Sequence, residues 1–180
     1  MAAPSSLLMR RPDLDGEPLV PVLPAGYTVR LATPDDEEGL ATLLTAAFAE
    51  PWSVETVRER LTQAADVDAI YVIVFDGRPV ATASSRHDYE RFPGSGYVHW
   101  VAASSEHGGR RLGPALMDCL LIDFRNRGYR DAVLETDDFR LPAIRTYLRH
   151  GYVPVTEVKG ENHLKRWSVI LPQVLSPHRG

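Results

Sequence analysis

The feature of the sequence that most constrains the fold is a strand pattern that runs through a glycine turn directly into a long helix pattern. Residues 96–103 are predicted as a strand, and residues 111–127 as an amphipathic helix. Gly108 and Gly109 lie in the turn between them. Because a helix start exposes unpaired backbone N–H groups and the positive end of the helix dipole, this junction suits a pyrophosphate. A turn whose glycines serve only the connection would show the same pattern.

The patterns on either side of this junction predict one α+β domain. Prolines throughout residues 1–26 indicate an extended N-terminal arm rather than a helix. Antiparallel runs of strands, with helices at separate points, indicate a mixed sheet covered by helices. We expect the domain over residues 27–171 and a C-terminal tail over 172–180. Its other expected elements are strands 27–32, 69–75, 80–86 and 131–136, helices 34–48 and 141–150, a short helix after Ser53, and a final hairpin of strands 152–158 and 164–171.

The composition excludes several classes of function. The chain has 180 residues, a formal net charge of -4 and a pI near 5.9, which argues against a general nucleic-acid binder because such domains are normally basic. Cys119 is the one cysteine, so we expect neither an intramolecular disulfide nor a cysteine-based metal cage. The six histidines show no H-x-x-x-H spacing, so no metal is expected. The sequence has no apolar run of signal-peptide or membrane-spanning length, and we expect a cytoplasmic protein without membrane contact.

A second segment supports a particular superfamily. The nucleotide-binding fingerprints G-x-x-x-x-G-K-[ST] and G-x-G-x-x-G after a strand do not occur. Residues 136–152 read TDDFRLPAIRTYLRHGY and follow the next expected strand. This segment, the loop Gly108–Gly113 and the order of elements from residue 27 to about 171 resemble the GNAT superfamily of acyltransferases. The N-terminal arm and residues 137–152 are more loosely similar to its bacterial mycothiol synthase-like branch.

The resemblance implies a fold and an activity. The fold is the GNAT fold, a mixed and largely antiparallel sheet of six to seven strands with about four helices. The activity is transfer of an acyl group, usually acetyl, from a CoA thioester directly to a primary amine of a small molecule, with acetyl-CoA or another acyl-CoA as co-substrate. Two alternatives stay open: a donor that is an aminoacyl-tRNA or a carrier-protein thioester, and a non-catalytic acyl-CoA-binding module. Formation of a homodimer is also left open.

The resemblance also implies where the donor binds. The family's pyrophosphate loop, Q/R-x-x-G-x-G/A, falls on residues 108–113, with Gly108 in place of Gln or Arg and Arg111 in place of the first glycine. The strand before the loop would pair with the pantetheine arm through its backbone and help to polarise the thioester carbonyl. Arginines near the loop would hold phosphate, either of CoA or of a larger anionic donor. The residues expected to hold the donor are Val101, Ala102, Ala103, Gly108, Gly109, Arg110, Arg111, Leu112, Gly113 and Arg140.

Acyl transfer to an amine needs a group that takes a proton from the amine and one that returns a proton to the thiolate. Tyr147 matches the family's tyrosine near the thioester sulfur, and a phenol with a pKa of about 10 can donate at neutral pH. His99 shares a strand face with Tyr97 and has an intrinsic pKa near neutrality, so it is a candidate base. Glu135, on the neighbouring strand, is the next candidate. A water chain without any protein base is a further alternative.

The acceptor is expected to lie beside the turn between the first helices and the loop after the strand 80–86, as is usual in the family. Glu50 and Asp88 would hold the acceptor ammonium, Trp52 would form a wall of its pocket, and Tyr97 would lie at the usual position of the family's catalytic carboxylate. A core role for Trp52 and an ordinary polar loop around Asp88 would explain the same residues.

Overall fold

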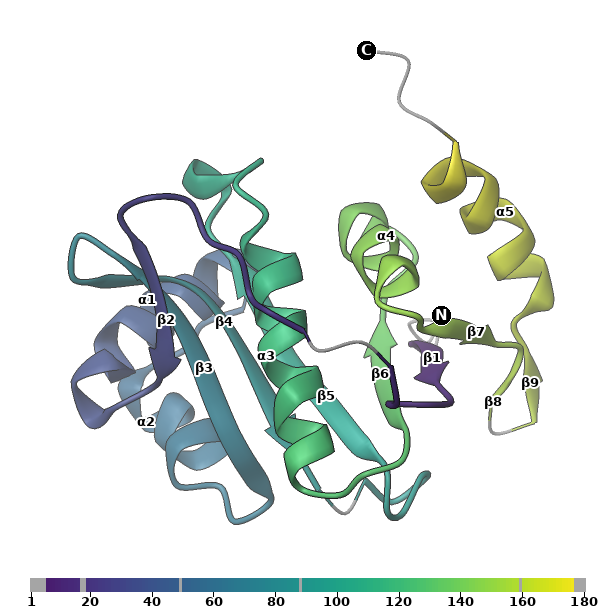
Figure 1. Ribbon diagram of the computed structural model, residues 1–180, viewed down its shortest axis with the longest axis horizontal. Coiled ribbons are helices and arrows are strands. Elements are labelled where there is room, and N and C mark those ends of the chain that lie inside the picture. The colour runs from purple at the N-terminus through teal and green to yellow at the C-terminus, as the bar shows by residue number, and fades with distance from the viewer. Residues whose placement is uncertain (1–5, 17–18, 49, 88, 159, 177–180) are drawn as a thin grey trace.

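In the computed structural model of the chain, residues 6–16, 19–48, 50–87, 89–158 and 160–176 are described. Their main strands are β1 (Leu7–Arg11), β2 (Tyr27–Leu31), β3 (Val67–Phe75), β4 (Arg78–Arg86), β5 (Gly96–Ala103), β6 (Ala132–Thr136) and β7 (Val153–Val155). They form a seven-stranded sheet in the order β2-β3-β4-β5-β6-β1-β7 (Figure 1). Neighbouring strands are antiparallel except β5 and β6, which run parallel.

Helices cover both faces of this sheet. They are α1 (Glu37–Phe48), α2 (Val54–Val57), α3 (Leu112–Asn126), α4 (Leu141–Arg149) and α5 (Leu164–Leu175). Leu40, Leu44 and Val57 bring α1 and α2 into one core, on the face that also receives Val72 of β3. The helices α3, α4 and α5 share the larger core on the opposite face, and Figure 1 shows α3 lying in front of the sheet. The expected α+β class and mixed, largely antiparallel sheet are confirmed.

Close packing of α3 on β5 depends on a glycine. A Cβ built on Gly96 would lie 2.4 Å from the ring of Phe124, which is fully buried in α3. No side chain larger than hydrogen fits there without displacing that ring. This contact fixes α3, and therefore the loop at its N-terminus, against the strand that carries much of the site.

The expected boundary of the domain at residue 27 is wrong. The N-terminal segment is extended, but its residues 7–11 form β1, which lies inside the sheet between β6 and β7. Leu7 and Met9 are buried in the larger core, and Leu8 is buried in a separate cluster with Val133 of β6. Because both faces of so short a strand are covered, its sequence shows no alternation of apolar and polar residues that would indicate a strand.

The expected strand over residues 164–171 is also wrong, as is the tail beginning at residue 172. These residues form α5, whose buried side chains Trp167, Ile170 and Val174 recur at helical spacing. The short strands β8 (Glu157–Val158) and β9 (Glu161–Asn162) form a separate small sheet between β7 and α5.

Candidate active site

The site lies where the two parallel strands of the sheet separate. Residues 96–98 of β5 pair with residues 132–134 of β6, and the pairing stops there. Ser104 donates its backbone N–H to Val80 on β4, so the alternation along a strand turns the N–H groups of Ala103 and Val101 towards the gap between β5 and β6. These groups are available to pair with an extended ligand.

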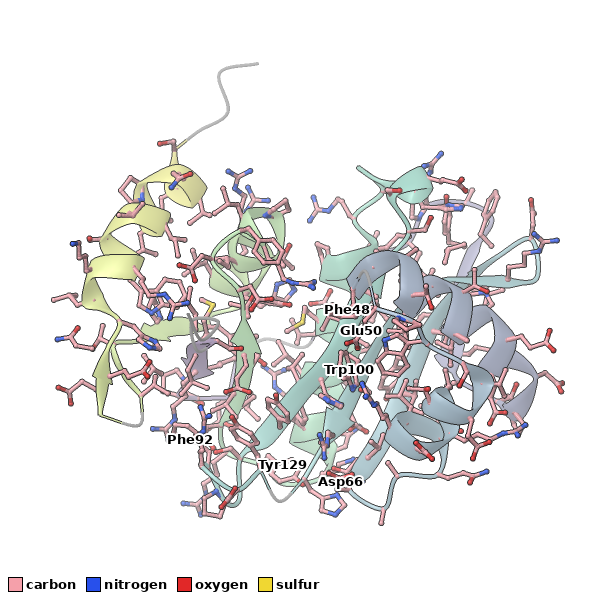
Figure 2. The ribbon with its side chains drawn as sticks, turned by 180° about the vertical axis from the view of Figure 1, so that it is seen from behind. Phe48, Glu50, Asp66, Phe92, Trp100 and Tyr129 are labelled. Atoms are coloured by element: carbon pink, nitrogen blue, oxygen red, sulfur yellow. The ribbon has the colours of Figure 1, made fainter. Side chains whose placement is uncertain are left out.

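A bulge in β5 shapes one wall of the gap. Trp100 has a φ of 49°, and the register between β4 and β5 shifts between Thr82 and Ser84. The extra residue directs both His99 and Trp100 to the face covered by α1 and α2, whereas Val101 packs on the opposite face. The Trp100 ring meets Phe48 edge-on at 5.0 Å between ring centroids, and Figure 2 shows these two side chains together between α1 and β5.

A cavity of about 540 Å³ runs from this gap along the start of α3. Every residue expected to hold the donor lines it, and the structure therefore brings all of them together. Sequence reasoning missed part of the opposite wall, which comes from α3 and α4. The missed residues include Met117, Pro142, Ala143 and Thr146.

The glycine loop presents a row of free backbone donors to this cavity. The N–H groups of residues 109–113 have no hydrogen-bond acceptor among the described residues. Gly109 and Arg111 take left-handed backbone conformations, with φ of 74° and 60°. Arg111 thus adopts, at the position where the family has glycine, a conformation that glycine adopts without strain. The departure from the family pattern changes the side chain while the loop keeps a glycine-like backbone.

A smaller cavity of about 270 Å³ lies on the other side of the gap. We call it the acceptor cavity and the larger one the donor cavity, after the residues expected in each. The acceptor cavity shares Val101, Arg140 and Tyr147 with the donor cavity, so these residues mark the corner where the two cavities meet. Its remaining lining residues are Ser6, Phe48, Tyr97, Val98, His99, Trp100, Leu134, Glu135, Thr136 and Asp137.

Tyr147 is suited to donate a proton at this corner. Its side chain is buried, and burial raises the pKa of its phenol to about 12, with the cation of Arg140 acting in the opposite direction. Its hydroxyl makes no hydrogen bond to any other described residue. The phenol therefore stays protonated at neutral pH, and its proton is not engaged by the protein.

The two candidate bases have very different environments. Burial, together with the nearby Arg86 and Arg60, lowers the pKa of His99 to about 3, so its imidazole is neutral and weakly basic at neutral pH. Arg86 Nη1 lies 3.3 Å from His99 Nε2. Glu135 instead receives a hydrogen bond of 2.9 Å from Arg91 on one oxygen and one of 3.3 Å from Tyr97 on the other.

The residues expected to hold the acceptor are only partly brought to this cavity. Tyr97 lines it, but Glu50 and Trp52 line neither cavity. Trp52 is buried against Trp100, with its indole N–H donating to Glu50, because the turn after α1 folds back onto the core. Asp88 lies outside the described residues. Ser6 and Asp137 were missed, and Ser6 could have been found only by identifying β1 as a strand.

Comparison with known proteins decides the family. The profile of the Acetyltransferase (GNAT) family matches residues 38–152, which contain the glycine loop and Tyr147. The chain belongs to the GNAT acetyltransferase family. It is 32% identical over 154 residues to a mycothiol acetyltransferase of Actinosynnema mirum, covering 81% of this chain and 50% of that protein. A mycothiol acetyltransferase of Frankia casuarinae is 29% identical over 163 residues, covering 82% and 47%. The chain therefore spans about half the length of the curated relatives it matches.

Solved structures show the same GNAT fold. A GCN5-related N-acetyltransferase from Sphaerobacter thermophilus matches with a TM-score of 0.65 and 23% identity, covering 84% of this chain and 50% of that one. Another from Kribbella flavida matches with a TM-score of 0.56 and 26% identity, covering 84% and 55%. The expected GNAT fold is thus confirmed, with five helices in the described part of the chain.

No helix among the described residues has the length and apolar character needed to cross a bilayer. No three histidine, cysteine, aspartate or glutamate side chains in the described ranges gather as ligands of a metal ion would.

Proposed function

We propose that this GNAT protein is an N-acyltransferase that moves an acetyl group from acetyl-CoA to a primary amine of a small molecule by direct attack. The observation that carries the proposal is the meeting of the two cavities at Val101 and Tyr147. A thioester carbonyl at that corner would be reachable by an amine in the smaller cavity, while the rest of the donor extended towards the glycine loop.

The donor side is supported by the free N–H groups of residues 109–113 at the start of α3. The N–H groups and the helix dipole favour a pyrophosphate, and Arg110 and Arg111 add positive charge beside it. The backbone of Val101 and Ala103 would pair with the pantetheine arm, and the Val101 N–H would stabilise the oxyanion that develops on the carbonyl.

The environments of Tyr147, Glu135 and His99 suggest which group handles each proton. The neutral amine attacks the carbonyl carbon, the carbon–sulfur bond breaks, and Tyr147 gives its proton to the leaving thiolate. Glu135 takes the proton that the amine loses, directly or through water, because its carboxylate lines the smaller cavity and is oriented by Arg91 and Tyr97. The other carboxylate of that cavity, Asp137, is bound to Arg140. His99 would contribute as a neutral group, since its pKa lies far below neutrality.

The arginine distribution argues against a very large anionic donor. Arg110, Arg111 and Arg140 line the donor cavity. The other arginines of this third of the chain do not line that cavity. Arg125 donates to the backbone of Leu14, and Arg145 to that of Val174. A site for CoA therefore agrees better with the structure than one for a charged tRNA.

Direct binding and transfer test the proposal. Isothermal titration should detect acetyl-CoA binding to the purified chain, and mass spectrometry should detect acetylated products from a panel of primary amines. A different result would be that wild type binds acetyl-CoA and yet acetylates every amine only at a trace rate that Tyr147→Phe equals. That result would support the non-catalytic module instead. Absence of binding to any CoA thioester would refute the proposed donor, and charged tRNA would be tried next.

A further inference from the structure

Arg140 stands at the corner shared by the two cavities, and we propose that it binds a carboxylate of the acceptor. The acceptor would then be an α-amino acid or a similar molecule that carries a carboxylate beside its amine. This inference rests on the proposed function, because it names the acceptor class of the same site.

The guanidinium of Arg140 is held in one orientation. Its Cζ atom lies 4.6 Å from the centroid of the Phe48 ring and 5.6 Å from the centroid of the Phe139 ring. Its Nε donates a hydrogen bond of 3.2 Å to Asp137. Stacking on an aromatic ring and one anchoring hydrogen bond reduce the entropy that the side chain would lose when it binds a ligand.

The N–H groups on the two Nη atoms of this guanidinium make no hydrogen bond to another described residue. A guanidinium carries five N–H donors, and among the described residues Nε is the one side-chain donor of Arg140 that makes a hydrogen bond. The two Nη atoms form a fork that matches the two oxygens of a carboxylate. The side chain of Arg140 is 25% exposed, so this fork is sheltered and still reachable from the cavity.

The same cavity holds two carboxylates, Asp137, which accepts a hydrogen bond from Arg140 Nε, and Glu135. Glu135 lines the acceptor cavity and is oriented by Arg91 and Tyr97, as described above. A cation and an anion on the walls of one small cavity complement a ligand that carries both charges. The volume of about 270 Å³ falls below the roughly 300–1,000 Å³ of sites for drug-sized ligands, which favours a small acceptor.

A donor role for Arg140 predicts a different result. Because Arg140 also lines the donor cavity, it could instead contact a phosphate of CoA. In that case its loss would weaken acetyl-CoA binding and leave the choice of acceptor unchanged. If Arg140 binds the acceptor, its loss would raise KM for the acceptor and leave the Kd of acetyl-CoA unchanged.

The experiment measures acetyl transfer from acetyl-CoA to the standard L-amino acids, to their carboxamides, and to glucosamine and spermidine. Wild type should prefer an amino acid over its carboxamide at least tenfold in kcat/KM. The amine of a carboxamide is less basic and more often neutral, so amine basicity alone would favour the opposite order. Arg140→Gln should raise the KM for that amino acid at least tenfold and abolish the preference, with the Kd of acetyl-CoA changed less than twofold.

Two controls keep the comparison interpretable. Arg149→Gln changes an exposed arginine at the end of α4, the helix that Arg140 precedes. Arg149 lines neither cavity, so this variant should behave as wild type. Arg140→Lys keeps the charge without the fork and should lose part of the preference, which provides a second variant if Arg140→Gln fails to fold.

Three outcomes would overturn the inference. The first is equal use of carboxamides, or better use of glucosamine or spermidine. The second is a change in the Kd of acetyl-CoA with an unchanged KM for the acceptor. The third is transfer to glucosamine or spermidine with no transfer to any amino acid. Failure of the proposed function itself would show separately, as no binding of acetyl-CoA in the titration or as binding without transfer to any amine, and the inference would fall with it.

Discussion

The hydroxyl of Tyr97 donates a hydrogen bond of 3.3 Å to Oε2 of Glu135, across the parallel pair of strands at the acceptor cavity. Arg91 binds the other oxygen of the same carboxylate at 2.9 Å. Tyr97 stacks on Tyr89 with ring centroids 4.2 Å apart, so the loop after β4 braces the phenol that holds Glu135. The carboxylate is therefore oriented before any amine arrives.

Replacing this carboxylate should slow the reaction. We expect Glu135→Gln to lower kcat by about 10²-fold, because positioned proton transfer contributes roughly that much, and to leave the Kd of acetyl-CoA unchanged. Steady-state kinetics and titration calorimetry measure the two quantities. Glu157→Gln, an exposed carboxylate on β8, is the matched control. A variant at Glu135 that keeps more than half of the wild-type kcat would show that water accepts the proton.

Loss of the proposed acid should affect turnover more than binding. We expect Tyr147→Phe to lower kcat by about 10²-fold, since the thiolate would leave without a proton. Because burial raises the pKa of Tyr147 to about 12, the phenol is protonated throughout neutral and mildly alkaline pH. The kcat of wild type should therefore show no falling limb up to about pH 10, in rates measured from about pH 6 upwards. A falling limb near pH 8 would contradict this assignment.

Acid should destabilise the fold through His99. The pKa of His99 is about 3 in the folded chain and about 6.5 when unfolded, so the unfolded chain binds the extra proton as pH falls between these values. His99 should therefore lower the free energy of unfolding by up to about 2 kcal/mol between pH 7 and pH 5. Urea unfolding at both pH values should show that the free energy of unfolding falls less for His99→Asn than for wild type. Equal losses in the two proteins would show that His99 is not shielded from water.

The sequence predicted most elements of the fold because their patterns are local. The apolar spacing of residues 111–127 and the glycine turn before them depend on the chain's own geometry, so α3 and its loop were found. The donor residues came from the resemblance to the family, and they do line one cavity.

The missed features depend on contacts distant in sequence. β1 is recognisable only through its neighbours β6 and β7, and residues 164–171 are apolar and β-branched enough to suit a strand as well as a helix. The bulge at Trp100 requires a left-handed backbone conformation at this tryptophan, which no local sequence pattern indicates. The low pKa of His99 results from burial and from the position of Arg86, neither of which is visible in a strand's sequence.

The N-terminal segment should prove to be part of the core. Met9 is fully buried in the larger core, so Met9→Ala should lower the free energy of unfolding by about 2–5 kcal/mol. Val20→Ala, at a side chain that is 72% exposed, should change it by less than about 0.5 kcal/mol. Denaturant unfolding of the two variants measures the difference. Similar stabilities would mean that β1 is not held in the sheet in solution.

The position of β1 also imposes an order on folding. Arg10 of β1 and Asp131, the residue before β6, are 121 residues apart in the chain, yet Arg10 Nε donates a hydrogen bond of 2.6 Å to the Asp131 carboxylate. During synthesis the segment made early must wait for β6 and β7 before it can dock, and pairing over such a separation is slow. Until then the sheet stays open beside the acceptor cavity, because Ser6, which lines that cavity, immediately precedes β1. A growing chain thus makes its donor loop before it makes β6 and β7, the strands that hold β1 beside its acceptor cavity.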